Sequence, residues 1–155
     1  MTRILETLLP FKADNTIRGM KLPVYVFALI AAISIARSFI HLLAPDGGAG
    51  SIAGMDLTVA GSSGIIFAFS LWGSAQLIYA IIQIIVVIRY RSLVPLMYAL
   101  LILETLLREL VGHIKPVTFT HTPPGAIANN IILPLAALML VVALWNRKER
   151  LKAPE

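Results

Sequence analysis

Long apolar blocks separated by short polar links dominate the hydrophobic pattern of the chain. The four blocks span residues 22–43, 64–88, 93–114 and 128–146. A helix needs about 20 mostly apolar residues to cross the hydrocarbon core of a bilayer. The pattern therefore predicts an all-α fold, an integral membrane four-helix bundle. We expect residues 1–155 to form a single membrane domain, because the remaining segments are too short for a second fold.

The segment before the first block has a helical pattern of its own. Residues 2–11 read TRILETLLPF and place Ile4, Leu5, Leu8 and Leu9 on one face of a helix. This pattern predicts a short amphipathic helix that lies on the cytoplasmic surface of the membrane. The alternative is a frayed end.

The distribution of charge predicts the orientation. Only 14% of residues are charged, against roughly 25% in soluble domains, and the formal net charge is +5. Lys and Arg gather in the head 1–21, in the link between the second and third blocks and in the tail 147–155, whereas link 44–63 has none and link 115–127 has only Lys115. The positive-inside rule then places both termini in the cytoplasm. It also accounts for the net charge, so we expect no nucleic-acid partner.

The chain offers little for metal or redox chemistry. It has no cysteine, which excludes disulfides, thiolate metal sites and a dithiol mechanism. Asp46 and Asp56 are the only charges in the long outer link, and we expect them to be solvated turn residues. Asn129 and Asn130 are expected to cap the last helix.

The first and third blocks resemble each other. Shifting the chain by 71 residues aligns Arg37 with Arg108 and Pro45 with Pro116. This alignment predicts two helical hairpins that form a parallel repeat about an axis along the membrane normal. The alternative is chance similarity between apolar helices.

Several ionisable residues lie within the apolar blocks. Glu104 is expected near the bilayer midplane, where an ionisable residue costs ~2.5–3.5 kcal/mol even on the most lenient scale. Arg108 is four residues further on, so it shares a helical face with Glu104. In the same way, His41 shares a face with Arg37. We expect these two faces to point toward each other inside the bundle.

Glu109 and His113 belong to a different face of the third block. The two faces are roughly 100–140° apart at 3.6 residues per turn, so both cannot point at one spot. We expect Glu109 and His113 at a helix–helix or subunit interface near the headgroups.

The second block adds a polar and aromatic stripe. Trp72, Gln76, Tyr79 and Gln83 recur at spacings of four, three and four, which is one helical face. We expect this face to turn toward the acid and the two arginines. The predicted ligand-binding residues are Arg37, His41, Trp72, Gln76, Tyr79, Glu104 and Arg108, and we expect the polar pocket that they form to open toward the outer side of the membrane.

These residues allow more than one function. Two arginines with one deep acid suit an anionic group such as a carboxylate, a phosphate or a lipid head, while a quinone or another flat ring would use the aromatic residues and glutamines. The alternative is a structural or accessory subunit, in which Glu104 and Arg108 pair and polar residues join copies of the chain, or a larger complex. A third interpretation is a proton or ion path through Glu104.

An enzymatic role is not expected. The sequence has no phosphate-binding glycine loop, no His-x-x-Glu-His motif and no nucleophile–base–acid trio. We therefore predict no catalytic and no metal-ligating residues. Haem is not expected either, because His41 and His113 are shallow and one residue out of step.

Two stretches resemble a known group of proteins. The segment ARSFIHLLAP (36–45) carries Arg-x-x-x-His-Leu, and RYRSLVPLMYALLILETLLRELVGHIKP (89–116) follows the second block. Both are similar to the DoxX-like group of small four-helix bacterial membrane proteins. The resemblance implies a bundle fold and a bacterial inner membrane, and some members of the group are thought to accompany oxidoreductases or to handle quinones. Only Arg37 and His41 carry over, and the glycine-rich outer link departs from the group.

Overall fold

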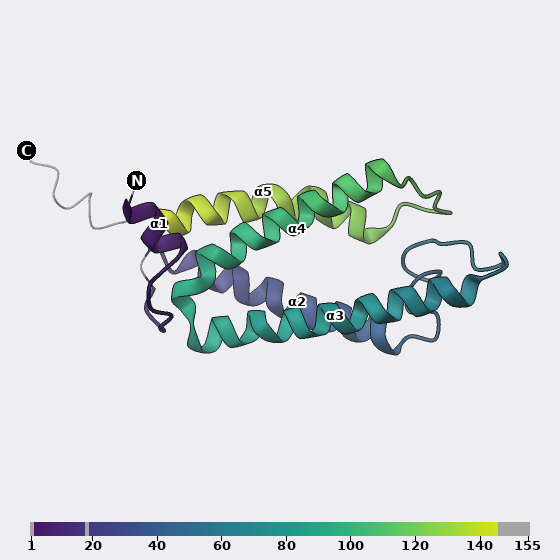
Figure 1. Ribbon diagram of the computed structural model, residues 1–155, viewed down its shortest axis with the longest axis horizontal. Helices are drawn as coiled ribbons and strands as arrows, with labels where there is room; N and C mark the ends of the chain where they lie inside the picture. Colours follow the sequence, from purple (N-terminus) through teal and green to yellow (C-terminus); the bar gives the residue numbers. More distant parts are fainter. Residues whose placement is uncertain (1, 18, 146–155) are drawn as a thin grey trace, which may run out of the picture.

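The computed structural model describes residues 2–17 and 19–145, and nearly all of its regular structure is helical. The helices are α1 (Thr2–Leu8), α2 (Leu22–Leu43), α3 (Ser62–Arg89), the 3₁₀ helix η1 (Arg91–Leu93), α4 (Val94–Ile114) and α5 (Pro124–Leu144) (Figure 1). No strand occurs in this described part of the chain. The all-α prediction is confirmed. The predicted basic tail, 147–155, lies outside the described residues.

Three of the long helices have the length and hydropathy of membrane-spanning segments. They are α2, α3 and α5, with mean hydropathies of 2.1, 2.0 and 2.3 over their most apolar windows. Helix α4 has 21 residues, but these include Glu104, Arg108 and Glu109. These features fit a membrane protein, while the number of spans and their orientation stay predictions.

Proline marks the start of three long helices. Pro23 and Pro95 lie in the first turns of α2 and α4, and Pro124 is the first residue of α5. Proline suits this position because the first helical N–H groups have no partner within the helix. The expectation that Asn129 and Asn130 cap the last helix is wrong, since α5 begins five residues before Asn129 and the two asparagines lie in its second turn.

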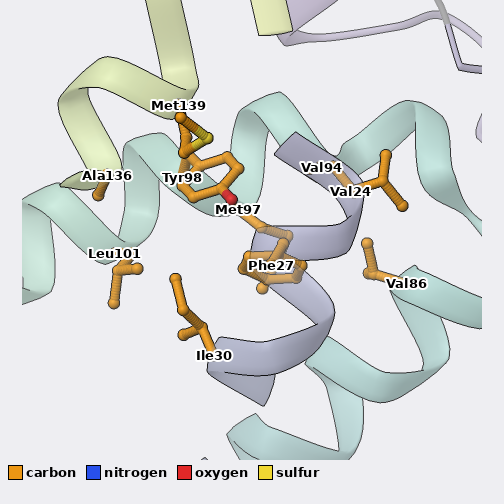
Figure 2. Packing of buried hydrophobic residues seen from close by; sticks show 10 residues of the cluster. All are labelled: Val24, Phe27, Ile30, Val86, Val94, Met97, Tyr98, Leu101, Ala136 and Met139. Atoms are coloured by element: carbon orange, nitrogen blue, oxygen red, sulfur yellow. The ribbon is translucent and has the colours of Figure 1, made fainter. Parts of the chain in front are cut away.

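The helices form two hairpins that converge at one end. Figure 1 shows α2 and α3 along one side and α4 and α5 along the other, with the pairs close together near α1 and separated toward the opposite end. A cluster of buried side chains fills the converging end (Figure 2). Within it, the Tyr98 hydroxyl donates a hydrogen bond to the Pro23 carbonyl at 2.8 Å, and the Tyr98 ring meets Phe27 edge-on at 5.3 Å. This contact ties α4 to the start of α2.

The N-terminal segment lies beside this converging end. Helix α1 ends at Leu8, and Ile4, Leu5 and Leu9 are exposed whereas Leu8 is partly buried, so the placement of this segment on the membrane surface stays a prediction. The chain that follows is tied to η1, because the Asp14 N–H donates to the Ser92 hydroxyl oxygen and that hydroxyl donates to the Asp14 carbonyl, both at 2.9 Å.

The long link between α2 and α3 is organised around Asp46. Its carboxylate accepts backbone N–H groups from Ser51 at 2.7 Å, Gly48 at 2.8 Å and Gly50 at 3.1 Å. These bonds, with those from Ser51 and Gly48 the strongest, lower the pKa of Asp46 to about 2. Asp46 is therefore the centre of a folded turn as well as a solvated residue. Gly48 adopts φ +72°, which glycine tolerates without strain.

Candidate ligand-binding cavity

A cavity of ≈ 550 Å³ lies between the two hairpins, in the part of the molecule where they separate. All four long helices and both outer links contribute to its walls. The seven residues that the sequence singles out all line it: Arg37, His41, Trp72, Gln76, Tyr79, Glu104 and Arg108. Helical periodicity places these residues on single faces of α2, α3 and α4, and the packing of the two hairpins brings together residues that are up to 71 positions apart.

One wall of the cavity is a single face of α3. Trp72, Gln76, Tyr79 and Gln83 follow one another along it. Gln83 belongs to the predicted stripe but not to the seven predicted residues. It is only 1% exposed, and its side chain hydrogen-bonds to that of Tyr79 one turn away.

Four polar atoms on the cavity wall are buried and make no hydrogen bond to the protein. They are both amide atoms of Gln76, Oε1 of Gln83 and Nε of Arg108. Leaving such a group without a partner costs about 1–3 kcal/mol, so buried polar atoms normally have one. Two of these atoms donate and two accept, and because they border a cavity, a molecule inside it together with accompanying water would supply the missing hydrogen bonds.

The charged side chains of the cavity are loosely paired. The Nη2 atom of Arg108 lies 3.6 Å from Oε1 of Glu104, and the two side chains are 27% and 35% exposed. This distance is that of an ion pair without a hydrogen bond. Arg37 lies within electrostatic range of both residues, and its guanidinium carbon is 5.7 Å from the centre of the Trp72 ring. Two cations and one anion therefore share the cavity.

His41 is held in place by its neighbours. Its ring is buried, with Nδ1 2.8 Å from the Gly47 carbonyl oxygen. Because a carbonyl oxygen only accepts, Nδ1 carries the proton of this hydrogen bond. The ring packs against Trp72 and Phe69 at centroid distances of 4.9 and 6.0 Å. His41 therefore joins the outer link to the aromatic part of the α3 wall.

The two outer links meet over the far end of the cavity. The N–H and hydroxyl of Thr120 both donate to the Gly54 carbonyl, at 2.8 and 3.1 Å. His121 is exposed, as an outer-link residue would be, yet its Nε2 lies 3.2 Å from the Ile52 carbonyl oxygen. Ile52 and Phe119, one from each link, line the cavity.

Helix α5 contributes more than the sequence indicates. Its apolar pattern predicts mainly a scaffold, whereas Ala128, Asn129 and Ile132 line the cavity. Asn129 is the one signal that points to this role, because an asparagine inside an apolar block needs a polar neighbour.

Glu109 and His113 lie away from the cavity. Neither lines it, and Nδ1 of His113 lies 2.9 Å from the backbone carbonyl oxygen of Glu109. His113 is exposed and Glu109 is partly exposed.

Comparison of the chain with known proteins gives no match. No protein-family model, no curated protein and no solved structure matches the chain. In residues 2–17 and 19–145, no group of three or more His, Cys, Asp or Glu side chains is placed to hold a metal ion. The chemistry of the cavity must therefore be inferred from its own residues.

Proposed function

We propose that this chain is a multi-pass membrane protein that binds a small, mostly apolar molecule carrying an anionic or polar group. The buried amide and guanidinium atoms without partners on the cavity wall carry this proposal. A cavity of ≈ 550 Å³ falls within the roughly 300–1,000 Å³ range of small-molecule sites. Ligand binding alone explains both the buried polar atoms without partners and the size of the cavity, so no catalytic step needs to be proposed.

We further propose that α4 is the fourth membrane span. Glu104 and Arg108 line the cavity, so they need not contact lipid, and the rest of α4 is largely apolar. The positive-inside rule supports cytoplasmic termini. The resemblance to the DoxX-like group supports a bacterial inner membrane and a bundle fold, and the alignment of Arg37 with Arg108 and of Pro45 with Pro116 supports two parallel-repeat hairpins.

The ligand chemistry follows from the walls. Arg37 and Arg108 outnumber the acid Glu104, which favours a carboxylate, a phosphate or a lipid head. The amides of Gln76 and Gln83 would hydrogen-bond a second polar group, such as the oxygen of a quinone. Apolar side chains cover most of the remaining wall.

The test is native mass spectrometry of the protein released from mild detergent, with an absorption spectrum of the same sample. The expected result is a stoichiometric bound molecule that is lost in the Arg37→Ala/Arg108→Ala double variant. The matched control is Arg89→Ala/Lys115→Ala, which removes the same charge outside the cavity and should retain the molecule.

The alternative is a structural or accessory subunit that assembles with itself or with a larger complex. The exposed His113 and its neighbour Glu109 are its candidate contacts. If Arg37→Ala/Arg108→Ala changed only the assembly state, with no bound molecule in either protein, the cavity proposal would fail. If Glu109→Gln/His113→Gln impaired assembly while the bound molecule remained, the cavity proposal would stand.

A further inference from the structure

The outer end of the cavity is an unfavourable entrance for a molecule dissolved in water. Ile52 and Ala53 from one link and Phe119 and Pro123 from the other line it there. The links are hydrogen-bonded to each other through Thr120, whose N–H and hydroxyl both reach Gly54. A soluble anion would have to pass between joined loops that present apolar side chains.

The side of the cavity between α2 and α5 has a different character. Ile33, Ala36 and Ile40 are spaced along one face of α2, and all three line the cavity while remaining exposed. Ile33 is 58% exposed and Ile40 is 45% exposed. Side chains that border both the cavity and the molecular surface mark places where the cavity opens outward. Trp72 of α3 and Phe119 of the outer link are also exposed, but only the α2 positions form an aliphatic row along one helix face.

Helix α5 supplies the other edge of this opening. Gly125 and Ala128 are exposed and also line the cavity. Helices α2 and α5 meet in the buried cluster that contains Ile30 and Ala136 (Figure 2). Ile33 and Ala128 lie beyond that cluster, one and two turns further toward the links. The edge is therefore largely apolar and partly built from small residues, and it lies within the two helices that we propose as membrane spans.

Most polar groups of the cavity come from the other two helices, although Arg37 and Ser34 belong to α2 and Asn129 belongs to α5. The amides of Gln76 and Gln83 belong to α3, and Glu104 and Arg108 belong to α4. A molecule that enters between α2 and α5 would pass the exposed Ile33, Ile40 and Ala128, meet Arg37 beside them, and reach the amides of α3 and the ion pair of α4 across the cavity. Such an order suits an amphiphile that is already dissolved in the bilayer.

We infer that the ligand enters sideways from the membrane between α2 and α5, and that it is a membrane-dissolved amphiphile with one acidic group. The acidic group lies with Arg37 and Arg108, and the apolar part extends along Ile33 and Ile132 toward the opening. This inference rests on the proposed binding function and adds the route and the class of ligand.

Cysteine bridges across the two candidate entrances test the route. The chain has no cysteine of its own, so Ala36→Cys/Ala128→Cys places a unique pair on the two edges of the lateral opening. Met55→Cys/Val117→Cys places a matched pair on the outer links, at positions that do not line the cavity. Each pair is bridged with bismaleimides of increasing length in phosphatidylcholine nanodiscs. Palmitate supplied in the bilayer is the amphiphile probe, and butyrate supplied in the buffer has the same acidic group without the long chain.

The expected result is that palmitate binds the unbridged protein and the protein bridged across the links, but not the protein bridged between α2 and α5. Bridge length is the control: palmitate binding should return as the bismaleimide between positions 36 and 128 becomes longer, which a local effect of the substitutions or of the attached groups would not produce. Loss of binding only when the links are bridged would overturn the route, and butyrate binding as tightly as palmitate would overturn the ligand class, while in both cases the proposed binding function would survive. If neither acid bound the unbridged protein, and Arg37→Ala/Arg108→Ala released no other molecule, the inference and the proposed function would fail together.

Discussion

Gly73 of α3 lies directly against His41 of α2, so closely that a Cβ atom at Gly73 would be 2.7 Å from the Cβ of His41. The same Cβ would be 2.9 Å from the His41 carbonyl carbon and the Leu42 nitrogen. Only glycine permits this approach of two helix backbones. The contact also sets the position of the His41 ring, which packs on Trp72.

Replacing Gly73 by alanine should therefore separate α2 from α3. The added methyl group meets backbone atoms, which cannot move out of the way as a flexible side chain would. Overpacking of this kind costs about 1–3 kcal/mol of unfolding free energy. Thermal unfolding in detergent, followed by circular dichroism, should show a lower midpoint for Gly73→Ala, and Trp72 fluorescence should change with it.

Gly64→Ala is the control on the same helix. A Cβ at Gly64 meets no atom within 4 Å. Alanine is the better helix former by roughly 0.5–1 kcal/mol, so this variant should be as stable as the parent protein or slightly more stable. Equal midpoints for Gly73→Ala and the parent would mean that the two helices can separate at no cost.

The α3 wall and the charged pair of α4 are predictable from the sequence because they depend on local geometry. Residues three and four apart share a helical face whatever surrounds them, which is why Gln76 and Tyr79 point the same way. The high cost of an acid in hydrocarbon likewise directs Glu104 inward.

Other features of the cavity depend on contacts that local spacing does not encode. Thr120 bonds to Gly54 across 66 residues, and only the folded chain brings the two links together. The contribution of Asn129 depends on how α5 is rotated, and a helix with apolar residues all round its surface leaves that rotation undetermined.

The carboxyl group of Asp46 should titrate far below an ordinary aspartate. Its pKa is about 2 in the folded protein, against roughly 3.9 for an unperturbed side chain. Because folding lowers this pKa, the stabilisation of the link is complete above about pH 4 and is lost as the pH falls toward 2. Hydrogen exchange at the Gly48, Gly50 and Ser51 amides should accelerate over that range.

Asp46→Asn provides the comparison for this titration. The amide cannot ionise, so exchange at the same three positions should be faster at neutral pH and should lose its acid dependence after correction for intrinsic rates. A titration midpoint of Asp46 near 4 in a carbon-detected NMR spectrum would contradict the proposed network.

Gln76→Leu should stabilise the protein when the cavity holds no ligand. Both amide atoms of Gln76 lack a hydrogen-bond partner in the protein, and leucine of similar size removes their desolvation penalty. We expect a gain of about 1 kcal/mol in the unfolding free energy of the ligand-free protein, together with weaker ligand binding. Thermal unfolding with and without the bound molecule measures both effects.

Gln83→Leu is the matched variant for this experiment. The Gln83 side chain hydrogen-bonds to Tyr79, so its replacement sacrifices a bond and should bring a smaller gain or a loss. A lower unfolding midpoint for ligand-free Gln76→Leu would show that the Gln76 amide already has a partner, such as bound water.

Glu104→Gln distinguishes a binding cavity from a purely structural ion pair. The substitution keeps the shape of the side chain and removes the single acid that lies near Arg37 and Arg108. In a binding cavity, an acidic ligand no longer competes with Glu104 for the two guanidinium groups. The binding free energy of the ligand should then become more favourable by about 1 kcal/mol, which is a roughly fivefold lower Kd. This gain should shrink at high ionic strength.

Glu109→Gln makes the same charge change one turn further along α4 without touching the cavity, and it should leave the affinity unchanged. Titration of palmitate into nanodiscs that contain each variant provides the measurement. If Glu104 serves only to hold α4 in the bundle, Glu104→Gln should instead lower the unfolding midpoint and leave palmitate binding no tighter than in the parent protein. An increase in affinity would therefore indicate that the two arginines bind an acidic ligand. Arg108 would then pair with Glu104 in the ligand-free protein and with the ligand in the bound protein.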